Sequence, residues 1–365
     1  MRYSTYAKGA AKLESLIVAM LVVACWLFAP ASILGAETNQ PAARKDGATG
    51  DKTKTAQLLQ DYRNDLVLIE GKTGRASGFI ADWNGRKYLV SNAHVLAEIK
   101  TPRYRLLDNS PLKLGRAMVA LGHDIIMVNV TDGGNGIPTV PFGVAEARFG
   151  DEVVVPGNAG GEGVVNPLQG EVVGIGADRI EISAPIEPGS SGSPIIHVRS
   201  GKAVGVATYL TIKPSVSLSG TNVSRELKVR RFGYRLDTIP GWQVVDWTRF
   251  HVEAEELRKI EHMSYELLTA FWDIGSASRT NQDRHLYDSR ELSSAIDQYF
   301  LALNQGHREA KGAFRDLIVS LRAVSQSDVE RRSFTYDFFR RRFEEEATWR
   351  TGIVTILDKA LDNYP

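Results

Sequence analysis

Gly189-Ser190-Ser191-Gly192-Ser193-Pro194 lies between two apolar runs, 179–183 and 194–197, that have the composition of β-strands. Glycine adopts the positive φ angles of tight turns, so glycines on both sides predict a turn that lifts a serine hydroxyl out of the chain. Backbone N–H groups left unpaired in such a turn can converge on an anion. These features predict half of an acyl-transfer site, with Ser191 as the nucleophile.

A base and a group that orients it would complete such a site, and both occur upstream. His94 follows the strand-like run 87–91, at the start of a short helical turn where the position of an imidazole can be fixed. Asp124 directly precedes an apolar run, and a carboxylate drawn toward burial there needs a partner such as a histidine N–H. We predict His94 as the general base and Asp124 as the residue that orients it.

Each of these residues also has a simpler interpretation. His94 can be a packed structural histidine, Asp124 can cap the turn at Gly122, and Ser191 can belong to a flexible linker. His123 is a rival base, but neighbouring residues on a strand point to opposite faces, so His123 should not share a face with Asp124. The order His, Asp, Ser inside one strand-rich region favours a catalytic triad over these alternatives.

The composition excludes several classes of site. The chain has 365 residues, enough for about two domains. Its formal net charge is +1, so we do not expect nucleic acid as a partner. Cys25 is the single cysteine, which leaves no disulfide and no thiolate metal site for the rest of the chain. The seven histidines show no recognised metal-binding spacing, and we expect no metal and no cofactor.

The first 36 residues have the pattern of a targeting segment. Three basic residues precede an unbroken apolar run, Leu16–Phe28, and small residues follow it. This pattern predicts a cleaved signal peptide over 1–36. The apolar stretch is also long enough to span a bilayer, so an uncleaved membrane anchor is the alternative, and lipidation of Cys25 is a third. Each places the body outside the cytoplasm, and the lack of disulfides favours a bacterial periplasm over other secreted settings.

The remaining chain divides by composition into three parts. Residues 37–57 are polar without apolar periodicity and predict a flexible linker. Residues 58–245 contain twelve short strand-like runs separated by Gly, Pro, Asn and Asp, which predicts an all-β domain. Residues 246–365 have apolar residues at helical spacing and predict a separate all-α domain. Its four expected helices cover 248–274, 289–304, 308–325 and 328–363, the last broken near Gly352.

The strand-rich region resembles the trypsin-like serine proteases, in the style of the HtrA/DegP branch of bacterial envelope proteases. Ser91-Asn-Ala-His94 resembles the family's T-[AN]-A-H motif, and Asp124-Ile-Ile-Met-Val128 resembles its D-[IV]-A-[LV]-L strand. Pro188-Gly-Ser-Ser-Gly-Ser-Pro194 resembles P-G-N-S-G-G-P, and Ala76-Ser-Gly-Phe-Ile80 resembles G-S-G-F-I. The resemblance covers about half of the chain.

The resemblance implies an all-β double barrel with the triad in the cleft between the barrels. Ser191 would attack a peptide carbonyl, and the backbone N–H groups of Gly189 and Ser191 would form the oxyanion hole. It also implies that Pro185, Ala207 and Thr208 contact the substrate. Pro185 replaces the acidic residue that selects Lys or Arg, so an apolar or small side chain is expected before the cleaved bond.

The sequence departs from the family's pattern at three further places. Ser193 replaces the usual second glycine after the nucleophile, and its Cβ is expected to narrow the site. Ser190 replaces the aspartate that pairs with a new N-terminus in the digestive members, so activation by that kind of cleavage is not expected. A helical tail stands where the HtrA branch carries a PDZ domain, so substrate delivery of that kind cannot be carried over.

We therefore expect an exported serine endopeptidase acting on polypeptides. A protein partner for the helical domain is left open, and membrane contact is expected only through an uncleaved N-terminal segment. The alternative is a catalytically idle protease fold that binds proteins, using the helical domain for interaction. An esterase of the α/β-hydrolase class is disfavoured, because the G-x-S-x-G elbow of that class does not occur around Ser191.

Overall fold

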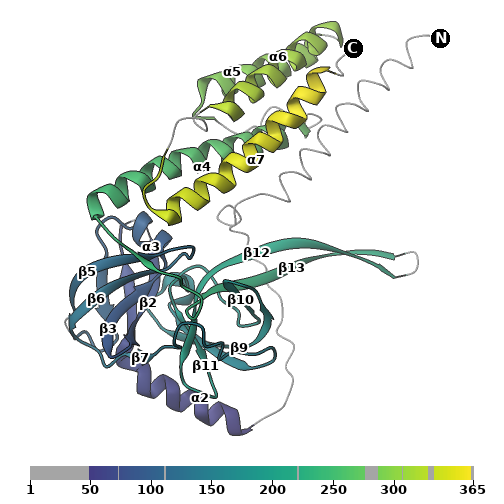
Figure 1. Ribbon diagram of the computed structural model, residues 1–365. Coiled ribbons are helices and arrows are strands. Elements are labelled where there is room, and N and C mark those ends of the chain that lie inside the picture. The colour runs from purple at the N-terminus through teal and green to yellow at the C-terminus, as the bar shows by residue number, and fades with distance from the viewer. Residues whose placement is uncertain are drawn as a thin grey trace. The chain divides into compact units, whose positions relative to one another are not determined.

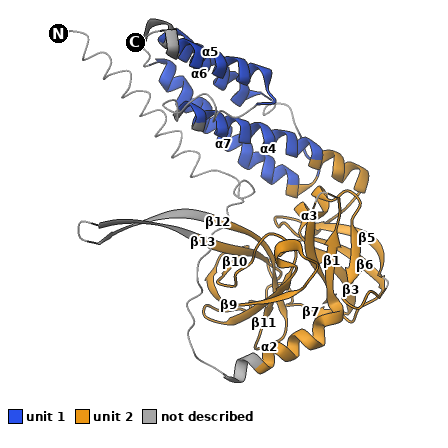
Figure 2. Ribbon diagram, turned by 180° about the vertical axis from the view of Figure 1, so that it is seen from behind, with its two compact units in different colours: residues 1–35, 255–335, 339–365 blue, residues 36–254, 336–338 orange. Residues whose placement is uncertain are grey.

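The computed structural model describes residues 49–72, 74–110, 112–219, 222–275, 287–305, 307–327 and 333–362. The predicted targeting segment and most of the predicted linker lie outside these ranges. Two compact units are distinguished, a strand-rich unit through Ala254 that also takes in 336–338, and a helical unit of 255–335 and 339–365 (Figure 2). Within the described ranges, no helix has both the length and the apolarity needed to cross a membrane.

The strand-rich unit begins with an eight-stranded sheet. Its strands follow the order β14-β5-β6-β3-β2-β1-β4, with β7 added parallel to β2. All its other pairings are antiparallel, as expected for short strands joined by turns. The strands are β1 (Leu66–Glu70), β2 (Arg75–Trp83), β3 (Arg86–Ser91), β4 (Arg103–Leu106), β5 (Lys113–Ala120), β6 (Ile126–Asp132), β7 (Ile137–Pro138) and β14 (Trp242–Val244).

A closed barrel follows, in the order β10-β13-β12-β11-β8-β9 (Figure 1). Buried side chains of the sheet and of the barrel belong to one continuous apolar core, which includes Phe79 and Val90 from the sheet and Val154 and Ile195 from the barrel. The predicted all-β architecture of two barrel-like halves is thereby confirmed. The barrel strands are β8 (Glu152–Gly157), β9 (Asn166–Ile175), β10 (Arg179–Ile182), β11 (Pro194–His197), β12 (Ala203–Ser219) and β13 (Asn222–Arg235).

The hairpin of β12 and β13 is longer than the sequence predicted. The strand-like runs of the sequence cover 203–209 and 229–236, but the two strands remain paired out to Ser219 and Asn222. Figure 1 shows both continuing past the barrel. Among the described residues, β12 beyond Ala207 has no strand partner except β13. An edge strand tolerates proline, which explains why Pro214 does not end β12.

The predicted flexible linker is wrong over residues 49–57, which belong to helix α2 (Thr49–Tyr62). The polar composition of this stretch gives no indication of three side chains that contact the core in the folded chain. Leu58, Leu59 and Tyr62 pack against the apolar core of the strand-rich unit. The hydroxyl of Tyr62 donates to the carbonyl of Gly201 at 2.8 Å, and the Nζ of Lys54 donates to the carbonyl of Arg199 at 2.7 Å. Tertiary contacts therefore hold a helix that has almost no amphipathic pattern.

Helix α4 (Trp247–Gly275) starts inside the strand-rich unit. Phe250 is fully buried there, and its ring meets the edge of Tyr336 at a centroid distance of 5.3 Å. The amide of Asp246 donates to the hydroxyl of Tyr336 at 2.8 Å, and the amide of Tyr336 donates to Glu253 at 3.1 Å. These contacts explain why residues 336–338 belong to the strand-rich unit although they are distant from it in sequence.

The helical unit contains the rest of α4 together with α5 (Arg290–Gln305), α6 (His307–Gln326) and α7 (Asp337–Asp362). Its apolar core includes Leu267, Ile296, Leu317 and Leu357, each from a different helix. The predicted helices agree with these bounds to within a few residues, except that α7 begins later than expected. The core side chains recur at helical spacing, which is why the sequence reveals this unit clearly.

The predicted break near Gly352 is wrong, because α7 runs continuously to Asp362. Glycine inside a helix is unfavourable by about 1 kcal/mol relative to alanine. Ile353 and Leu357 are buried beside it, and their packing outweighs that amount. A Cβ at Gly352 would meet no atom within 4 Å, so the glycine is not needed for space.

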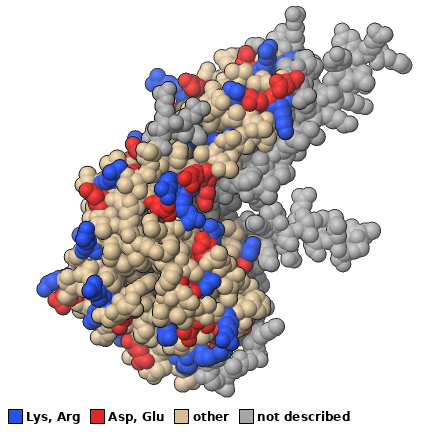
Figure 3. All heavy atoms as spheres, in the orientation of Figure 1, with Lys and Arg blue, Asp and Glu red and all other residues tan. Residues whose placement is uncertain are grey.

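Charged side chains are interspersed on the face drawn in Figure 3. Lys and Arg alternate there with Asp and Glu over the strand-rich unit. This face therefore shows mixed charge and no single basic field.

Glu346, in the helical unit, should make the stability of the folded protein depend on pH. Burial raises the pKa of this carboxyl, which is 5% exposed, while Ser264 and Arg350 lower it in part. Because the pKa of Glu346 is higher in the folded state than in the unfolded state, the folded state loses stability as the pH rises through the range between these two pKa values. We expect Glu346→Gln to raise the melting temperature at pH 8, and the gain to shrink toward pH 5. Thermal unfolding followed by circular dichroism measures both.

The matched control is Glu345→Gln, because Glu345 is exposed on the same helix. Its melting temperature should stay close to the wild-type value across the same pH range. An equal gain in both variants, or no gain from Glu346→Gln at pH 8, contradicts the prediction.

Candidate active site

His94 and Asp124 meet in the first sheet. His94 lies in the first turn of helix α3 (Ala93–Glu98), directly after β3, and Asp124 lies in the turn that leads into β6. One carboxylate oxygen of Asp124 accepts the backbone N–H of His94 at 2.9 Å, and the other lies 2.5 Å from its Nδ1. Both carboxylate oxygens therefore hold the same residue, which fixes the backbone and the ring together.

This contact sets the tautomer of His94. An ionised carboxylate only accepts hydrogen bonds, so the Nδ1 of His94 carries the proton that faces Asp124. The Nε2 of the neutral ring is left as an acceptor, the form that a general base requires. The side chain of His94 is 21% exposed and that of Asp124 is 11% exposed. The acid is thus more buried than the base it orients.

The rival base His123 is engaged elsewhere. It is buried, its Nδ1 lies 3.0 Å from the carbonyl of Leu121, and its Nε2 lies 2.8 Å from the hydroxyl of Thr238. These contacts agree with the expectation that the side chains of His123 and Asp124 point to different faces.

Ser191 lies in a tight turn between β10 and β11. Gly189 has φ 95° and Gly192 has φ 88°, the region that favours glycine. A Cβ at Gly192 would lie 2.0 Å from the carbonyl oxygen of Ser77, and one at Gly189 would lie 2.2 Å from that of Asn158. Both positions therefore require glycine for conformation and for space.

Ser77, on β2 of the first sheet, attaches this turn to the sheet. Its amide donates to the carbonyl of Ser191 at 2.9 Å, and its hydroxyl donates to the carbonyl of Gly189 at 2.8 Å. The carbonyl of Ser77 accepts from the hydroxyl of Ser91 at 2.8 Å, on the strand that leads to His94. The nucleophile turn and the base are thereby attached to the same strands.

Two carbonyls determine where the amides of the turn point. The carbonyl of Pro188 accepts from the amide of Gly160 at 2.9 Å, and the carbonyl of Ser190 accepts from that of Ser193 at 3.0 Å. In a trans peptide unit the C=O and N–H point in opposite directions, so the N–H groups of Gly189 and Ser191 point away from those contacts. Among the described residues, neither N–H has an acceptor. The arrangement suits two donors for an oxyanion.

The Ser191 hydroxyl donates to the carbonyl of Thr208 at 3.2 Å in this structure, and the residue is half-buried. A rotation about χ1 would release the hydroxyl from this carbonyl. The structure thus joins His94 to Asp124 directly, and it holds the Ser191 turn through Ser77 to the strands that precede His94.

The model of the family described as the trypsin-like peptidase domain matches residues 76–206, which contain His94, Asp124 and Ser191. This part of the chain is a trypsin-like peptidase domain. No curated protein matches the chain.

Solved structures with partial likeness to the peptidase domain include proteases. Rv3671c from M. tuberculosis, as an inactive Ser343Ala mutant, is 18% identical over 54% of this chain and 91% of that one, with a TM-score of 0.38. The serine endoprotease from Yersinia pestis is 19% identical over 42% of this chain and 57% of that one, with a TM-score of 0.35. Deg5 is 24% identical over 44% of this chain and 87% of that one, with a TM-score of 0.36.

The residues expected to contact substrate separate into two positions. Ala207 and Thr208 lie beside the nucleophile, since the amide of Gly192 donates to the carbonyl of Ala207 at 2.9 Å. Ala207 is fully buried, and its amide donates to the carbonyl of Ser193 at 2.9 Å, so neither its side chain nor its backbone is exposed to a substrate in this structure. Pro185 is exposed on the segment between β10 and the turn, and no described contact joins it to His94 or Ser191.

Ser193 does not narrow the cleft, contrary to the expectation from sequence. Its side chain is fully buried, and a Cβ at Gly157 on β8 would lie 2.2 Å from its hydroxyl oxygen. The side chain therefore occupies space that Gly157 leaves free inside the barrel. Among the described residues, the Ser193 hydroxyl has no hydrogen-bond partner.

Sequence reasoning missed Ser77, Asn92 and Gly160 as parts of the site. Ser77 and Asn92 lie inside the quoted motifs, so their positions could have been marked but their partners could not. Gly160 lies in the 3₁₀ turn Ala159–Gly161, where sequence carries no signal for the contact with Pro188.

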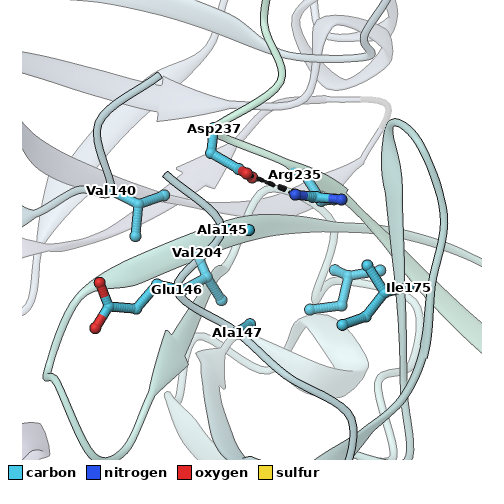
Figure 4. A pocket seen from close by; sticks show the side chains of 9 residues that line it. Val140, Ala145, Glu146, Ala147, Ile175, Val204, Arg235 and Asp237 are labelled. Carbon is cyan, nitrogen blue, oxygen red and sulfur yellow. Dashed lines mark hydrogen bonds and ion pairs between the residues drawn. The ribbon is translucent and has the colours of Figure 1, made fainter. Parts of the chain in front are cut away.

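Two further features were considered as sites. The hollow in Figure 4 lies against Val140, Ile175 and Val204, and its polar wall is the ion pair of Arg235 with Asp237 at 2.6 Å. In the helical unit, ligand atoms of His262, Glu266 and Asp288 lie within 4.8 Å of one another. Glu266 already accepts from the amides of Asp288 and Ser289, which attaches the segment before α5 to α4.

The pair Gly157 and Ser193 supports a stability prediction. Gly157→Ala should destabilise the strand-rich unit by about 1–3 kcal/mol, because the new methyl group overlaps the Ser193 hydroxyl. In a Ser193→Gly background the same change should lose most of that penalty. Urea unfolding of the two single variants and the double variant measures the difference, and equal penalties in both backgrounds contradict the assignment.

Proposed function

We propose that the peptidase domain is a serine endopeptidase with Ser191 as nucleophile, His94 as general base and Asp124 as the residue that orients it. The observation that supports this most strongly is the two-point contact of Asp124 with His94. The two donors at Gly189 and Ser191 complete the chemistry on the other side of the scissile carbonyl. No metal and no cofactor takes part.

In the first half-reaction the Oγ of Ser191 attacks the peptide carbonyl carbon and its proton passes to the Nε2 of His94. Asp124 stabilises the imidazolium that forms. The carbonyl oxygen becomes an oxyanion, bound by the N–H groups of Gly189 and Ser191. Loss of one such donor costs about 3 kcal/mol of transition-state stabilisation, so the carbonyl contacts that aim these amides matter directly.

Collapse of this first intermediate completes the first half-reaction: His94 gives its proton to the leaving amine, and the acyl group remains on Ser191. The second half-reaction is hydrolysis of this ester. A water molecule then attacks the ester carbonyl while His94 accepts its proton. Collapse of the second tetrahedral intermediate returns the proton to Ser191 and releases the acid. The same two amides bind the oxyanion in both halves.

The second candidate function is a protease fold that binds proteins without cleaving them. The hydrogen bond from the Ser191 hydroxyl to the carbonyl of Thr208 is the observation that favours it. Rotation of one hydroxyl removes this obstacle, and the contact of Asp124 with His94 already has the form that a general base requires. We therefore favour the enzyme.

We also propose that the protein is exported to a bacterial periplasm, by a cleaved signal peptide or held by an uncleaved anchor. The support is the basic start and the apolar run Leu16–Phe28. Cell fractionation with N-terminal sequencing of the mature chain tests both forms. Recovery of the full-length chain from the cytoplasm contradicts the proposal.

A fluorophosphonate probe tests the enzyme against the binding protein. Wild-type protein should be labelled on Ser191 and should cleave a peptide library preferring an apolar or small residue before the scissile bond. Ser191→Ala should lose both activities with an unchanged melting temperature. Well-folded wild-type protein that is neither labelled nor active overturns the proposed function.

Asp124→Asn tests the role of the carboxylate. The amide NH₂ would face the Nδ1 of His94 and favour the tautomer that carries its proton on Nε2. We expect kcat to fall by about 10⁴-fold at neutral pH. Steady-state kinetics on a peptide substrate measures the loss, and a fall of less than about tenfold contradicts the assigned role.

A further inference from the structure

Asn92 lies between β3 and α3 and is fully buried. Its side-chain nitrogen donates to the backbone carbonyl of Asp124 at 2.7 Å and to the hydroxyl oxygen of Thr208 at 2.9 Å. A carbonyl only accepts hydrogen bonds, so the atom that faces Asp124 must be the NH₂ group. The orientation of the amide is therefore determined by its partners.

This one amide spans the seam between the two halves of the peptidase domain. Asp124 lies on the first sheet, where its carboxylate holds His94. Thr208 lies on β12 of the barrel, where its carbonyl accepts the Ser191 hydroxyl at 3.2 Å. Asn92 thus contacts the residue that orients the base and the residue that holds the nucleophile, one on each side.

A purely local role for Asn92 does not fit its contacts. It occupies the N-cap position of α3, where an asparagine side chain ordinarily accepts an amide of the first turn. Here Asp124 accepts the amide of His94 instead, and Asn92 makes no side-chain cap. Its own side-chain oxygen is buried without a partner among the described residues, which is unfavourable for stability.

We propose that Asn92 is a positioning residue that sets the His94–Asp124 pair in register with Ser191 by bridging Asp124 and Thr208. This inference rests on the proposed function. Asn92 does not touch the reacting atoms, and it acts through the two residues that it bridges. A displacement of about 1 Å between reacting groups can lower a rate by about 100-fold, so the effect should appear in kcat.

The test uses the full chain and a peptide substrate. Asn92→Ala removes both hydrogen bonds of the bridge, and Thr208→Val removes the one to Thr208. Each should lower kcat about 10- to 100-fold with KM within about threefold. The kcat of the double variant should be within about twofold of the kcat of the less active single variant, because the bridge can be lost only once. Thr208→Ser keeps the hydroxyl and should lower kcat by less than Thr208→Val does.

Asn129→Ala is the matched control. Asn129 is a partly buried asparagine on β6 of the same sheet, outside the site, and its kcat should remain near the wild-type value. Asn92→Ala with kcat within about twofold of wild type overturns the proposal. So does a double variant whose losses simply multiply, or a change confined to KM or to the melting temperature.

A second readout does not need turnover. The Nδ1 of His94 and the Oδ2 of Asp124 lie 2.5 Å apart, and the proton between them should give a low-field NMR resonance. It should shift or broaden in Asn92→Ala and Thr208→Val and persist in Thr208→Ser and Asn129→Ala. An unchanged resonance in the first two overturns the positioning role, whereas an unlabelled, inactive wild type with the expected NMR pattern overturns only the proposed function.

Discussion

The hydrogen bonds of Ser77 are the contacts on which the site depends. Its amide and hydroxyl hold the carbonyls of Ser191 and Gly189, and its carbonyl accepts from Ser91 beside the base. The hydroxyl also accepts the amide of Asn158 at 2.9 Å, from the loop after β8. Each such bond contributes only about 1 kcal/mol net, but leaving a buried partner unmade costs about 1–3 kcal/mol. A structure in which only some of these hydrogen bonds form is therefore strongly disfavoured.

Division of the site between two rigid halves explains its geometry. The first sheet supplies His94 and Asp124, and the barrel supplies Ser191 with its two amides. Because each half is fixed by its own ladder of backbone hydrogen bonds, the relative position of the halves decides whether the three groups can react. The contacts that cross the seam, from Ser77 and Asn92, would therefore affect the proposed reaction although neither residue takes part in it.

The sequence predicted the strands, the helices of the tail and the three candidate catalytic residues, because each leaves a local signal. Glycines bracket Ser191, and apolar runs flank His94 and Asp124. It could not predict contacts between distant segments. One example is the hydrogen bond from Tyr62 to Gly201, which helps to hold the polar residues of α2 as a helix on the strand-rich unit. The expectation that Ser193 narrows the site had the same weakness, because the space that its side chain fills is left by Gly157, far from it in the chain.

The structure of the protein with a peptide boronic acid bound tests the central claim most directly. The account predicts a covalent bond from boron to the Oγ of Ser191, with one boronate oxygen about 3 Å from the amides of Gly189 and Ser191. The other boronate oxygen should approach the Nε2 of His94, whose Nδ1 remains on Asp124. A bound boronate whose oxygens contact neither amide, or an imidazole that stays out of reach of the adduct, contradicts the account.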